Sequence, residues 1–344
     1  MAGAPQGGAE NHYVRLILAL HEDTDIVQLP ILRTHAEREA TLAHAGLSPI
    51  TMRFGGPIDF GTQIRLRRTL QDFGPDVVLT WMSRAAHKCP AGPWKLAARL
   101  GGYYNLKYYR RIEYFIGISE GICRYLAQND IPGDRIWHIP NFADETPAPP
   151  IPRAAHDTPG DVPLLLAAGR LHRNKGFDVL LDAISGLPDV WLWIAGEGPE
   201  RTALERRVAV SGAAERIRLL GHLPDPRERL ASWRALLVTS HHEGSPIGVM
   251  EALALGTPVL SARLLGVAEI LDGQGGWIEE TRDPEAWARR LKRILDDEAC
   301  GTAASRAARS RYLVALTADS AAARTAALYR AALGLGGEGR PGAP

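Results

Sequence analysis

The chain has few cysteines, no long apolar run and almost no net charge, and each shortage excludes a class of protein. Its three cysteines, Cys89, Cys123 and Cys300, are far apart and form no CxxC pair, which argues against a disulfide framework or a structural zinc. No apolar stretch approaches the roughly 20 residues that cross a bilayer, and Met1–Glu10 lacks the pattern of a secretion signal. The net charge of +1 gives no global attraction to nucleic acid. We therefore expect a cytoplasmic protein.

The length and composition favour two globular domains. The chain has 344 residues, of which 45% are apolar and 23% charged. A proline-rich stretch, Glu145–Val162, has the composition of a semi-rigid connector. We expect a first domain over residues 1–147, a linker over 148–162, a second domain over 163–311, a helix over 312–333 that packs back toward the first domain, and a disordered tail over 334–344.

The second half alternates short apolar runs with longer helical patterns. This alternation predicts parallel βα units with both faces of the sheet covered, which is a doubly wound domain. The predicted strands are Pro163–Ala168, Val190–Ala195, Ile217–Leu220, Ala235–Ser240, Thr257–Ser261 and Gly276–Ile278.

The first half shows the same rhythm less regularly. Its predicted strands are Asp25–Leu32, Pro49–Arg53, Asp76–Trp81, Tyr114–Ile118 and Arg135–Ile139. The glycine loop Gly7-Gly8-Ala9-Glu10 opens a helical pattern, yet no strand precedes it, although such a loop normally leaves a central strand. Either that strand lies before the given sequence, or the sheet is built without it.

Two cations follow the first strand of the second half. Gly169-Arg170 comes directly after the apolar run, and Lys175 opens the next helix after a polar loop. A forked guanidinium and a point-charge ammonium could together hold the phosphates of a nucleoside diphosphate. From this segment alone, two solvated surface cations remain the alternative.

Two carboxylates flank a small-residue loop further along the chain. Glu243 ends a predicted strand and Glu251 lies in the helix that follows Gly-Ser-Pro-Ile-Gly. The helix N-terminus offers free N–H groups to a diphosphate, and each carboxylate can accept hydrogen bonds from sugar hydroxyls. An ordinary capped helix is the competing interpretation.

The same segments resemble a known family. EGSPIGVMEALALGTPVLS, at Glu243–Ser261, resembles the Glu-x7-Glu signature of the retaining family 4 glycosyltransferases, or group 1 glycosyl transferases. AAGRLHRNKGFDVLLDAI, IAGEGPERTALE and IRLLGHLP match further motifs of that family in the same order. The match covers about Pro163–Leu295, whereas the first half is similar only at GGAE and at Tyr114–Phe142.

The resemblance implies a GT-B fold, an α/β architecture of two Rossmann-like, doubly wound parallel-sheet domains that face across a cleft. It implies retaining transfer of a sugar from a nucleoside-diphosphate sugar, without a metal or other cofactor. Glu243, Arg170 and Lys175 take the catalytic positions. Gly7 and Gly8 would reach the diphosphate from the first domain. The donor-binding positions are Gly169, Glu197, Gly198, Pro199, His222, Leu223, Gly244, Ser245, Pro246, Ile247, Gly248 and Glu251.

The acceptor side is predicted from charge and aromatic content. Between Phe60 and Ile112 there are ten basic and two acidic residues, an excess of +8 (10 − 2), with tryptophans and tyrosines interleaved. Such a stretch suits an anionic membrane surface, a lipid-linked acceptor or an acidic glycan such as a lipopolysaccharide core, and equally a solvated helix face over core aromatics. Many relatives carry a sugar-facing histidine where this chain has Arg99-Leu-Gly-Gly-Tyr103. The acceptor-side candidates are Arg84, His87, Arg99 and Tyr103.

These features predict a glycosyltransferase that acts on a glycan or lipid-linked acceptor at the inner face of the plasma membrane. A GT-B-fold epimerase that acts on the nucleotide sugar is an alternative, although the Glu-x7-Glu match disfavours it. A non-catalytic nucleotide-sugar-binding protein is another, motivated by the strand that is not seen before the glycine loop. Nucleic acid is not an expected partner, because the predicted donor site makes that improbable.

Overall fold

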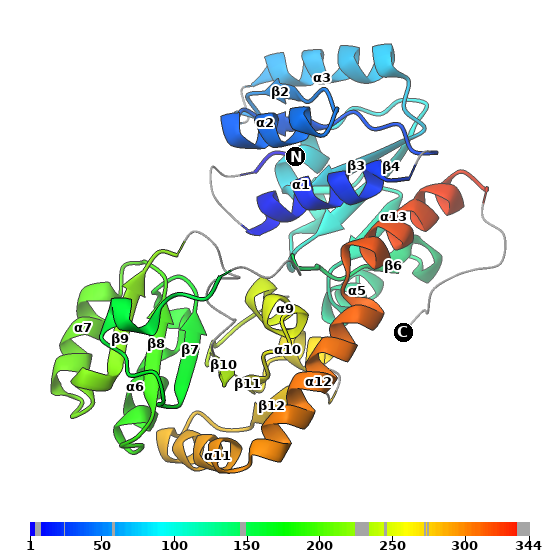
Figure 1. Cartoon of the computed structure of the whole chain (residues 1–344). Helices are drawn as coiled ribbons and strands as arrows, with labels where there is room; N and C mark the ends of the chain where they lie inside the picture. Colours follow the sequence, from blue (N-terminus) through cyan, green and yellow to red (C-terminus); the bar gives the residue numbers. More distant parts are fainter. Residues whose placement is uncertain are drawn as a thin grey trace. The chain divides into compact units, whose positions relative to one another are not determined.

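The structure is a computed structural model that describes residues 1–3, 8–23, 25–56, 59–144, 149–223, 234–243, 246–271, 273 and 275–335. It divides into two compact units, and each is described by itself. One comprises Met1–Asn141 together with Ala318–Pro344, and the other comprises Phe142–Thr317. Figure 1 labels the elements of both.

The second unit is built on a six-stranded parallel sheet with the strand order β12-β11-β10-β7-β8-β9. The strands are β7 (Leu164–Ala168), β8 (Trp191–Ala195), β9 (Ile217–Gly221), β10 (Ala235–Val238), β11 (Val259–Ala262) and β12 (Gly276–Glu279). All six strands predicted for this half are confirmed, with bounds that shift by one to two residues.

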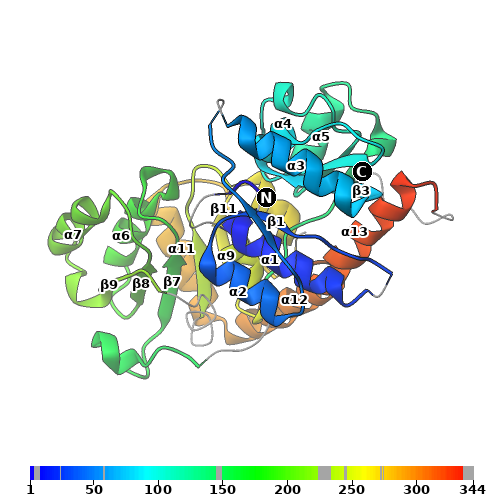
Figure 2. The ribbon, with the colours of Figure 1, turned by 90° about the horizontal axis from the view of Figure 1, so that it is seen from above.

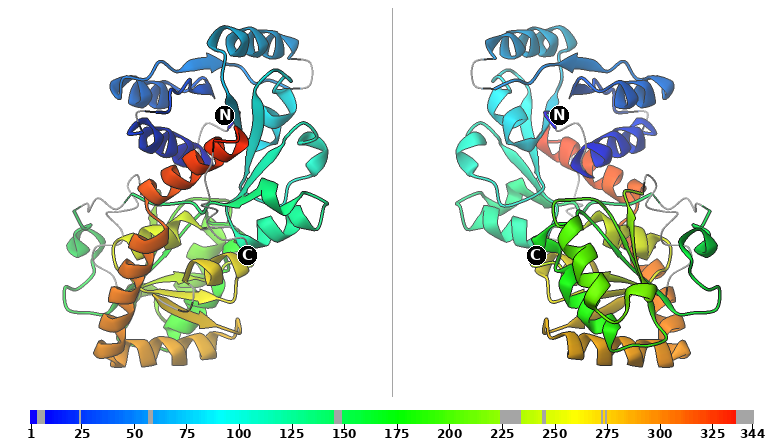
Figure 3. Two further views of the ribbon diagram at one scale, coloured as in Figure 1. Left: turned by 90° about the vertical axis from the view of Figure 1, so that its right-hand side faces the viewer. Right: turned by 90° about the vertical axis from the view of Figure 1, so that its left-hand side faces the viewer.

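Helices cover both faces of this sheet, as Figure 3 shows. They are η3 (Arg153–His156), η4 (Arg173–Lys175), α6 (Phe177–Ser185), α7 (Arg201–Val210), η5 (Ala214–Arg216), α9 (Ile247–Ala254), α10 (Leu265–Leu271), α11 (Pro284–Asp296) and α12 (Glu298–Ala315). Alternate residues of β7 point to opposite cores. Leu165 packs with α6 and α11, whereas Leu164 and Leu166 pack with α9, α10 and α12. A strand buried on both faces explains why the sequence is continuously apolar there.

The first unit contains a four-stranded parallel sheet, β3-β4-β5-β6, and a separate parallel pair, β1-β2. Its strands are β1 (Ile31–Arg33), β2 (Ile50–Met52), β3 (Val77–Trp81), β4 (Lys95–Leu100), β5 (Tyr114–Gly117) and β6 (Ile136–His138). Its helices are α1 (Gly8–His21), α2 (Ala36–His44), α3 (Phe60–Phe73), α4 (Met82–Lys88), η1 (Leu106–Tyr108), α5 (Glu120–Ala127), η2 (Gly133–Arg135) and α13 (Ala318–Ala332). Helices α1 and α13 pack against each other, and both are labelled in Figure 2.

Within the described residues no strand precedes α1, and β1 is the first strand of the chain. The amino group of Met1 donates to the Ile31 carbonyl at 2.6 Å, and the Arg33 amide donates to the Met1 carbonyl at 3.1 Å. These are the hydrogen bonds of a residue that lies parallel to β1. Strand β1 is also shorter than the predicted Asp25–Leu32, because it begins only at Ile31.

Three further expectations differ from the structure. Strand β4 was not predicted, although it pairs with β3 and β5 along its length. The helix expected over 312–333 is two helices, since α12 ends at Ala315 and α13 begins at Ala318. The proline-rich linker is not a free connector where it is described: Thr158 accepts a hydrogen bond from the Trp193 indole at 2.9 Å, and the His156 ring packs on that indole.

A candidate donor site at the switch point of the second sheet

The candidate site lies where the strand order of the six-stranded sheet reverses. From β7 the chain moves outward through β8 to β9, and then returns to the other side of β7 as β10. The loops that follow β7 and β10 therefore diverge from neighbouring strand ends, which is where open α/β sheets bind ligands. The sequence predicted both loops as the core of the site.

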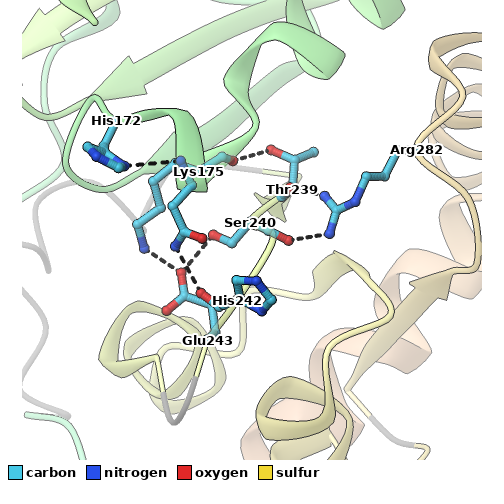
Figure 4. Close-up of polar contacts among 8 residues, drawn as sticks. His172, Lys175, Thr239, Ser240, His242, Glu243 and Arg282 are labelled. Atoms are coloured by element: carbon cyan, nitrogen blue, oxygen red, sulfur yellow. Dashed lines mark hydrogen bonds and ion pairs between the residues drawn. The ribbon is translucent and has the colours of Figure 1, made fainter. Parts of the chain in front are cut away.

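Hydrogen bonds connect these two loops, as Figure 4 shows. The His241 amide donates to the Asn174 carbonyl at 2.7 Å, and the Asn174 side-chain amide donates to the His242 carbonyl at 3.1 Å. The Thr239 hydroxyl donates to the Lys175 carbonyl at 2.9 Å. The backbones approach so closely that a Cβ on Gly176, whose φ is +59°, would lie 2.5 Å from the Thr239 carbonyl oxygen. The two loops thus form one rigid frame.

Lys175 and Glu243 meet on this frame, 68 residues apart in the chain. The lysine ammonium is hydrogen-bonded to Glu243 Oε1, and the Ser240 hydroxyl donates to the same oxygen at 2.7 Å. The side chains are 24% and 14% exposed. A half-desolvated ion pair that still faces solvent can be rearranged by an anionic ligand, because the ligand can compete for the ammonium.

Arg282 is a residue of the site that the sequence did not single out. Its guanidinium donates to the Thr239 carbonyl at 2.5 Å and to the Ser240 carbonyl at 2.7 Å (Figure 4). It lies just before Asp283, the N-cap of α11, so its only visible signal was a basic residue beside a capping aspartate. It fixes the backbone from which Ser240 and Glu243 project.

Arg170 stands apart from this network. It is exposed, and the described residues provide no hydrogen-bond or ion-pair partner for its guanidinium. Arg173, in the same loop, instead lies 3.6 Å from Glu200. A cation at a strand end that pairs with none of the described residues is available to a ligand.

The next two strand ends carry further residues that the resemblance predicts to bind the donor: Glu197, Gly198, Pro199, His222 and Leu223. The Gly196 amide donates to the Gly221 carbonyl at 2.7 Å, and the Leu171 amide donates to the Glu197 carbonyl at 2.9 Å. A Cβ at Gly196 would lie 1.8 Å from the Gly169 carbonyl oxygen, and one at Gly198 would lie 2.3 Å from the Leu171 carbonyl oxygen. The glycines thus allow these loops to stack above β7, β8 and β9.

Of the remaining residues at these ends, Glu197 forms an ion pair with Arg201 at 2.5 Å. The Glu197 side chain is 51% exposed. Hydrogen bonds to Glu205 and then charge interactions with both carboxylates raise the pKa of Arg201. Pro199 and His222 are exposed, and Leu223 is half-buried against the apolar core.

Helix α9 follows the β10 loop and supplies the second carboxylate. Pro246 is its N-cap residue, and Ile247 and Gly248 form its first turn without a side-chain cap. Glu251 is 8% exposed on this helix. Gly244 and Ser245, both predicted to bind donor, lie outside the described residues, as does Gly7 in the first unit; Gly8 is the first residue of α1.

The acceptor-side candidates do not form the continuous surface that the charge count suggested. Arg99 is 3% exposed in β4, where it donates to the Pro140 carbonyl at 3.1 Å and to Asn141 Oδ1 at 2.9 Å. Burial lowers its pKa to about 9. Lys88 is likewise buried, and Trp81, Trp94 and Tyr109 are core residues. The expectation that Arg99 belongs to a basic surface is therefore wrong.

The other three candidates differ in exposure and contacts. Tyr103 is 60% exposed and packs edge-on against Tyr125. His87 is exposed and packs edge-on against Tyr108. Arg84 donates to the Phe54 carbonyl at 2.9 Å, so it supports the loop after β2.

Within the described ranges, no cluster of three or more histidines, cysteines or acidic residues is placed to hold a metal ion. Nor does any helix of those ranges have the length and apolar character needed to span a membrane.

A doubly wound sheet that presents two cations, a carboxylate and an uncapped helix N-terminus at its switch point is typical of enzymes that bind nucleotides. Comparison with known proteins identifies the family. Residues 151–311 match the family model described as "Glycosyl transferases group 1". The chain is 31% identical, over 86% of its length and 88% of the relative, to the lipopolysaccharide core biosynthesis glycosyltransferase LpsE of Rhizobium meliloti (strain 1021). The chain belongs to the group 1 glycosyltransferases, and it is a glycosyltransferase with the GT-B fold.

Solved structures of low identity share that fold. A glycosyltransferase from Rickettsia africae ESF-5 superposes with a TM-score of 0.84 at 17% identity, covering 97% of each chain. Anabaena Alr3699/HepE, crystallised in complex with UDP and glucose, superposes with a TM-score of 0.78 at 16% identity, covering 94% of this chain and 97% of that one.

Proposed function

We propose that the protein transfers a sugar, with retention of anomeric configuration, from a nucleoside-diphosphate sugar to a glycan or lipid-linked acceptor of the cell envelope, a lipopolysaccharide core being the leading candidate. The convergence of Lys175, Ser240 and Glu243, with Arg170 exposed and unpaired among the described residues, carries this proposal. The relative LpsE acts in lipopolysaccharide core biosynthesis according to its name, which supports the acceptor class.

The site residues take distinct roles in this proposal. Arg170 and Lys175 bind the diphosphate, Glu243 contacts the transferred sugar, and Glu251 contacts the ribose. Backbone amides at the start of α9 also contact the donor. The base lies against the loops after β8 and β9. UDP is the first nucleotide to test, because HepE was crystallised with it.

The chemistry follows from where charge develops. The bond between the anomeric carbon and the diphosphate oxygen breaks, and its electron pair leaves with the diphosphate. The acceptor hydroxyl oxygen forms the new bond to that carbon and loses its proton. Cations and N–H dipoles held in advance by the frame of Asn174, Thr239 and Arg282 stabilise the departing negative charge. Because protein cations meet that charge, we expect EDTA to leave the rate unchanged.

Incubation with a panel of nucleotide sugars tests the proposal. A lipopolysaccharide-core oligosaccharide should increase release of the nucleoside diphosphate, and NMR of the product should show the anomeric configuration of the donor. Lys175→Ala and Glu251→Ala should each weaken donor binding. Nucleoside diphosphates that fail to bind, with variants that change nothing, would overturn the proposal. A new nucleotide sugar formed without acceptor would instead favour an epimerase.

The place of action is part of the same proposal. We infer that the enzyme works in the cytoplasm, at the inner face of the plasma membrane, where lipid-linked acceptors are exposed. Helix α3 supports a peripheral contact, because Ile64 is 57% exposed on it beside exposed arginines. Co-sedimentation with anionic vesicles tests this part.

A further inference from the structure

A pocket lies in the first unit, and none of its lining residues is assigned to the donor. It has a volume of about 810 Å³ and is lined by Arg33, Thr34, Arg53, Gly55, Asp59, Phe60 and Gly61. Arg33 ends β1, and Arg53 directly follows β2, its parallel neighbour. The pocket therefore lies at the carboxyl ends of parallel strands, where α/β units bind ligands. The chain runs from β2 through this loop into α3, as the labels in Figure 1 show.

Two arginines give the pocket its charge. The side chains of Arg33 and Arg53 are exposed, and the described residues offer neither of them a hydrogen-bond or ion-pair partner. Several arginines of the second unit are different: the exposed Arg173 and Arg207 and the half-buried Arg201 are each paired with a carboxylate. Two unpaired guanidiniums that line one pocket favour an anion with several acceptor oxygens, since each guanidinium can donate two parallel hydrogen bonds.

The wall of the pocket is held in place from α4. Arg84 donates to the Phe54 carbonyl at 2.9 Å, and the buried Lys88 donates to the Asp59 carbonyl at 3.0 Å. Phe54 is itself buried and has a positive φ of 45°. A non-glycine residue in that conformation persists only where its surroundings fix it, so this is a built loop.

Asp59 is the one acidic residue of the lining, and its charge is already engaged. Its carboxylate accepts hydrogen bonds from the Gly55 amide at 2.6 Å, the Thr62 amide at 3.0 Å and the Thr62 hydroxyl at 2.5 Å. The Thr62 side chain first, and then the backbone amides, lower the pKa of Asp59 to about 2. The carboxylate thus caps α3 locally, and the lining keeps a net positive charge of two arginines against one aspartate.

We propose that this pocket binds an anionic substituent, a phosphate or a carboxylate, on the acceptor glycan, an inference that rests on the proposed function. Arg33 and Arg53 hold the anion, and the exposed ring of Phe60 provides an apolar face for the adjoining sugar ring. The acceptor would then be recognised through its charge, by residues other than those that act on the transferred sugar.

The test uses the full chain with three small probes: glucose 6-phosphate, glucuronate and uncharged glucose. Binding is followed by NMR titration in the presence of saturating UDP. UDP then occupies the donor site, so the phosphate of the probe cannot bind there. The two anionic probes should bind and glucose should not. Arg33→Gln combined with Arg53→Gln should weaken the binding of both anions by about tenfold or more.

A charge-matched control separates the pocket from general attraction. Arg67→Gln combined with Arg68→Gln removes two exposed charges of α3 that do not line the pocket. It should change anion binding less than about twofold. Since all four arginines are exposed and without described partners, both double variants should melt at the wild-type temperature. The single variant Arg53→Glu repeats the test if the first pair folds poorly.

Four other outcomes would each overturn the proposal. Equal losses in the two double variants would mean unspecific attraction, and loss of anion binding when UDP is added would place the anion at the donor site. Equal binding of glucose would mean that charge is not recognised. If the pocket pair changed only binding to anionic vesicles, the surface would be a membrane contact. Failure of UDP itself to bind would count against the proposed function alone, since the response to Arg33 and Arg53 is read separately.

Discussion

At the residue scale, the Lys175–Glu243 pair gives the sharpest test of the donor site. Without ligand, Glu243 occupies the ammonium that the diphosphate requires. Glu243→Gln removes the competing charge, so we expect UDP alone to bind as tightly as to the wild type or more tightly. Sugar transfer should fall about 100-fold, because the negative charge that faces the reacting sugar is lost. Calorimetry with UDP and a transfer assay measure the two effects.

The control for this substitution is Glu200→Gln, which neutralises a carboxylate near Arg173 in the neighbouring loop. It should leave both UDP binding and transfer unchanged. If Glu243→Gln kept its transfer rate, Glu243 would have no role at the sugar, and the ion pair would only hold the loops together.

Substitution of Arg170 should change ligand binding without changing stability. Since no described residue partners its guanidinium, Arg170→Ala should melt within about 1 °C of the wild type. Its affinity for UDP should fall about tenfold, the value of a charge-assisted contact. Arg173→Ala is the matched variant in the same loop, and it should change UDP affinity less than twofold. Differential scanning fluorimetry and calorimetry supply both measurements, and equal losses for the two variants would argue against a specific phosphate contact.

At the element scale, α9 is expected to use its first turn for the donor. A Cβ at Gly248 would meet nothing within 4 Å, so the ligand-free protein tolerates Gly248→Ala and should gain about 0.5–1 kcal/mol of helix stability. The same Cβ should obstruct a phosphate or sugar that approaches the backbone, and donor affinity should fall. Gly301→Ala, in the equally open α12, is the control: urea denaturation should show a similar gain, with no change in donor binding.

The N-cap of α3 has a predictable pH dependence. The folded state lowers the pKa of Asp59 to about 2 from its ordinary value of 3.8, so the ionised carboxylate stabilises the fold above that ordinary value. That contribution is lost as the pH falls from about 4 toward 2. Asp59→Asn keeps an acceptor for the Thr62 amide but not the charge. It should melt below the wild type at pH 7, and the difference should shrink toward pH 2; a constant difference would assign the effect to packing.

Elements also show where sequence reasoning fails. Strand β4 was not predicted because Lys95 and Arg99 gave its segment the look of a basic surface. Arg99 is acceptable inside the fold only because Pro140, Asn141 and His12 come to it from distant parts of the chain. The proline-rich segment was misjudged for a similar reason, since its contacts with Trp193 span 35 residues. Composition describes a segment, but it does not show the partners that satisfy a buried polar group.

At the scale of the whole molecule, the second unit was far more predictable than the first. Its strands are short apolar runs, four of which begin at, end at or directly precede a glycine. The switch-point rule then places Lys175 and Glu243 at one edge without any knowledge of their contact. Arg282 could not be found in this way, because its role is to bind two backbone carbonyls of another loop. In the first unit the sheet is divided between β1-β2 and β3–β6, and no local pattern states how such pieces are ordered.

The division into two units leads to a prediction for the intact chain. UDP at 100 times its dissociation constant should stabilise the protein that binds it by about 2.7 kcal/mol. Hydrogen–deuterium exchange should show where that stabilisation acts. Amides of the loops after β7 and β10 and of α9 should become protected, because the frame built by Asn174, Thr239 and Arg282 holds the proposed phosphate contacts.

The paired helices α1 and α13 provide the internal reference in the same experiment. Their central turns carry none of the residues assigned to the donor, so their exchange should stay at the ligand-free rate. If, within α1, only Gly8 and the first turn became protected, the glycine loop would also contact the nucleotide. Protection spread evenly over both units, or none in the β10 loop, would contradict a donor site at the switch point, because only local contacts with bound UDP can slow those amides selectively.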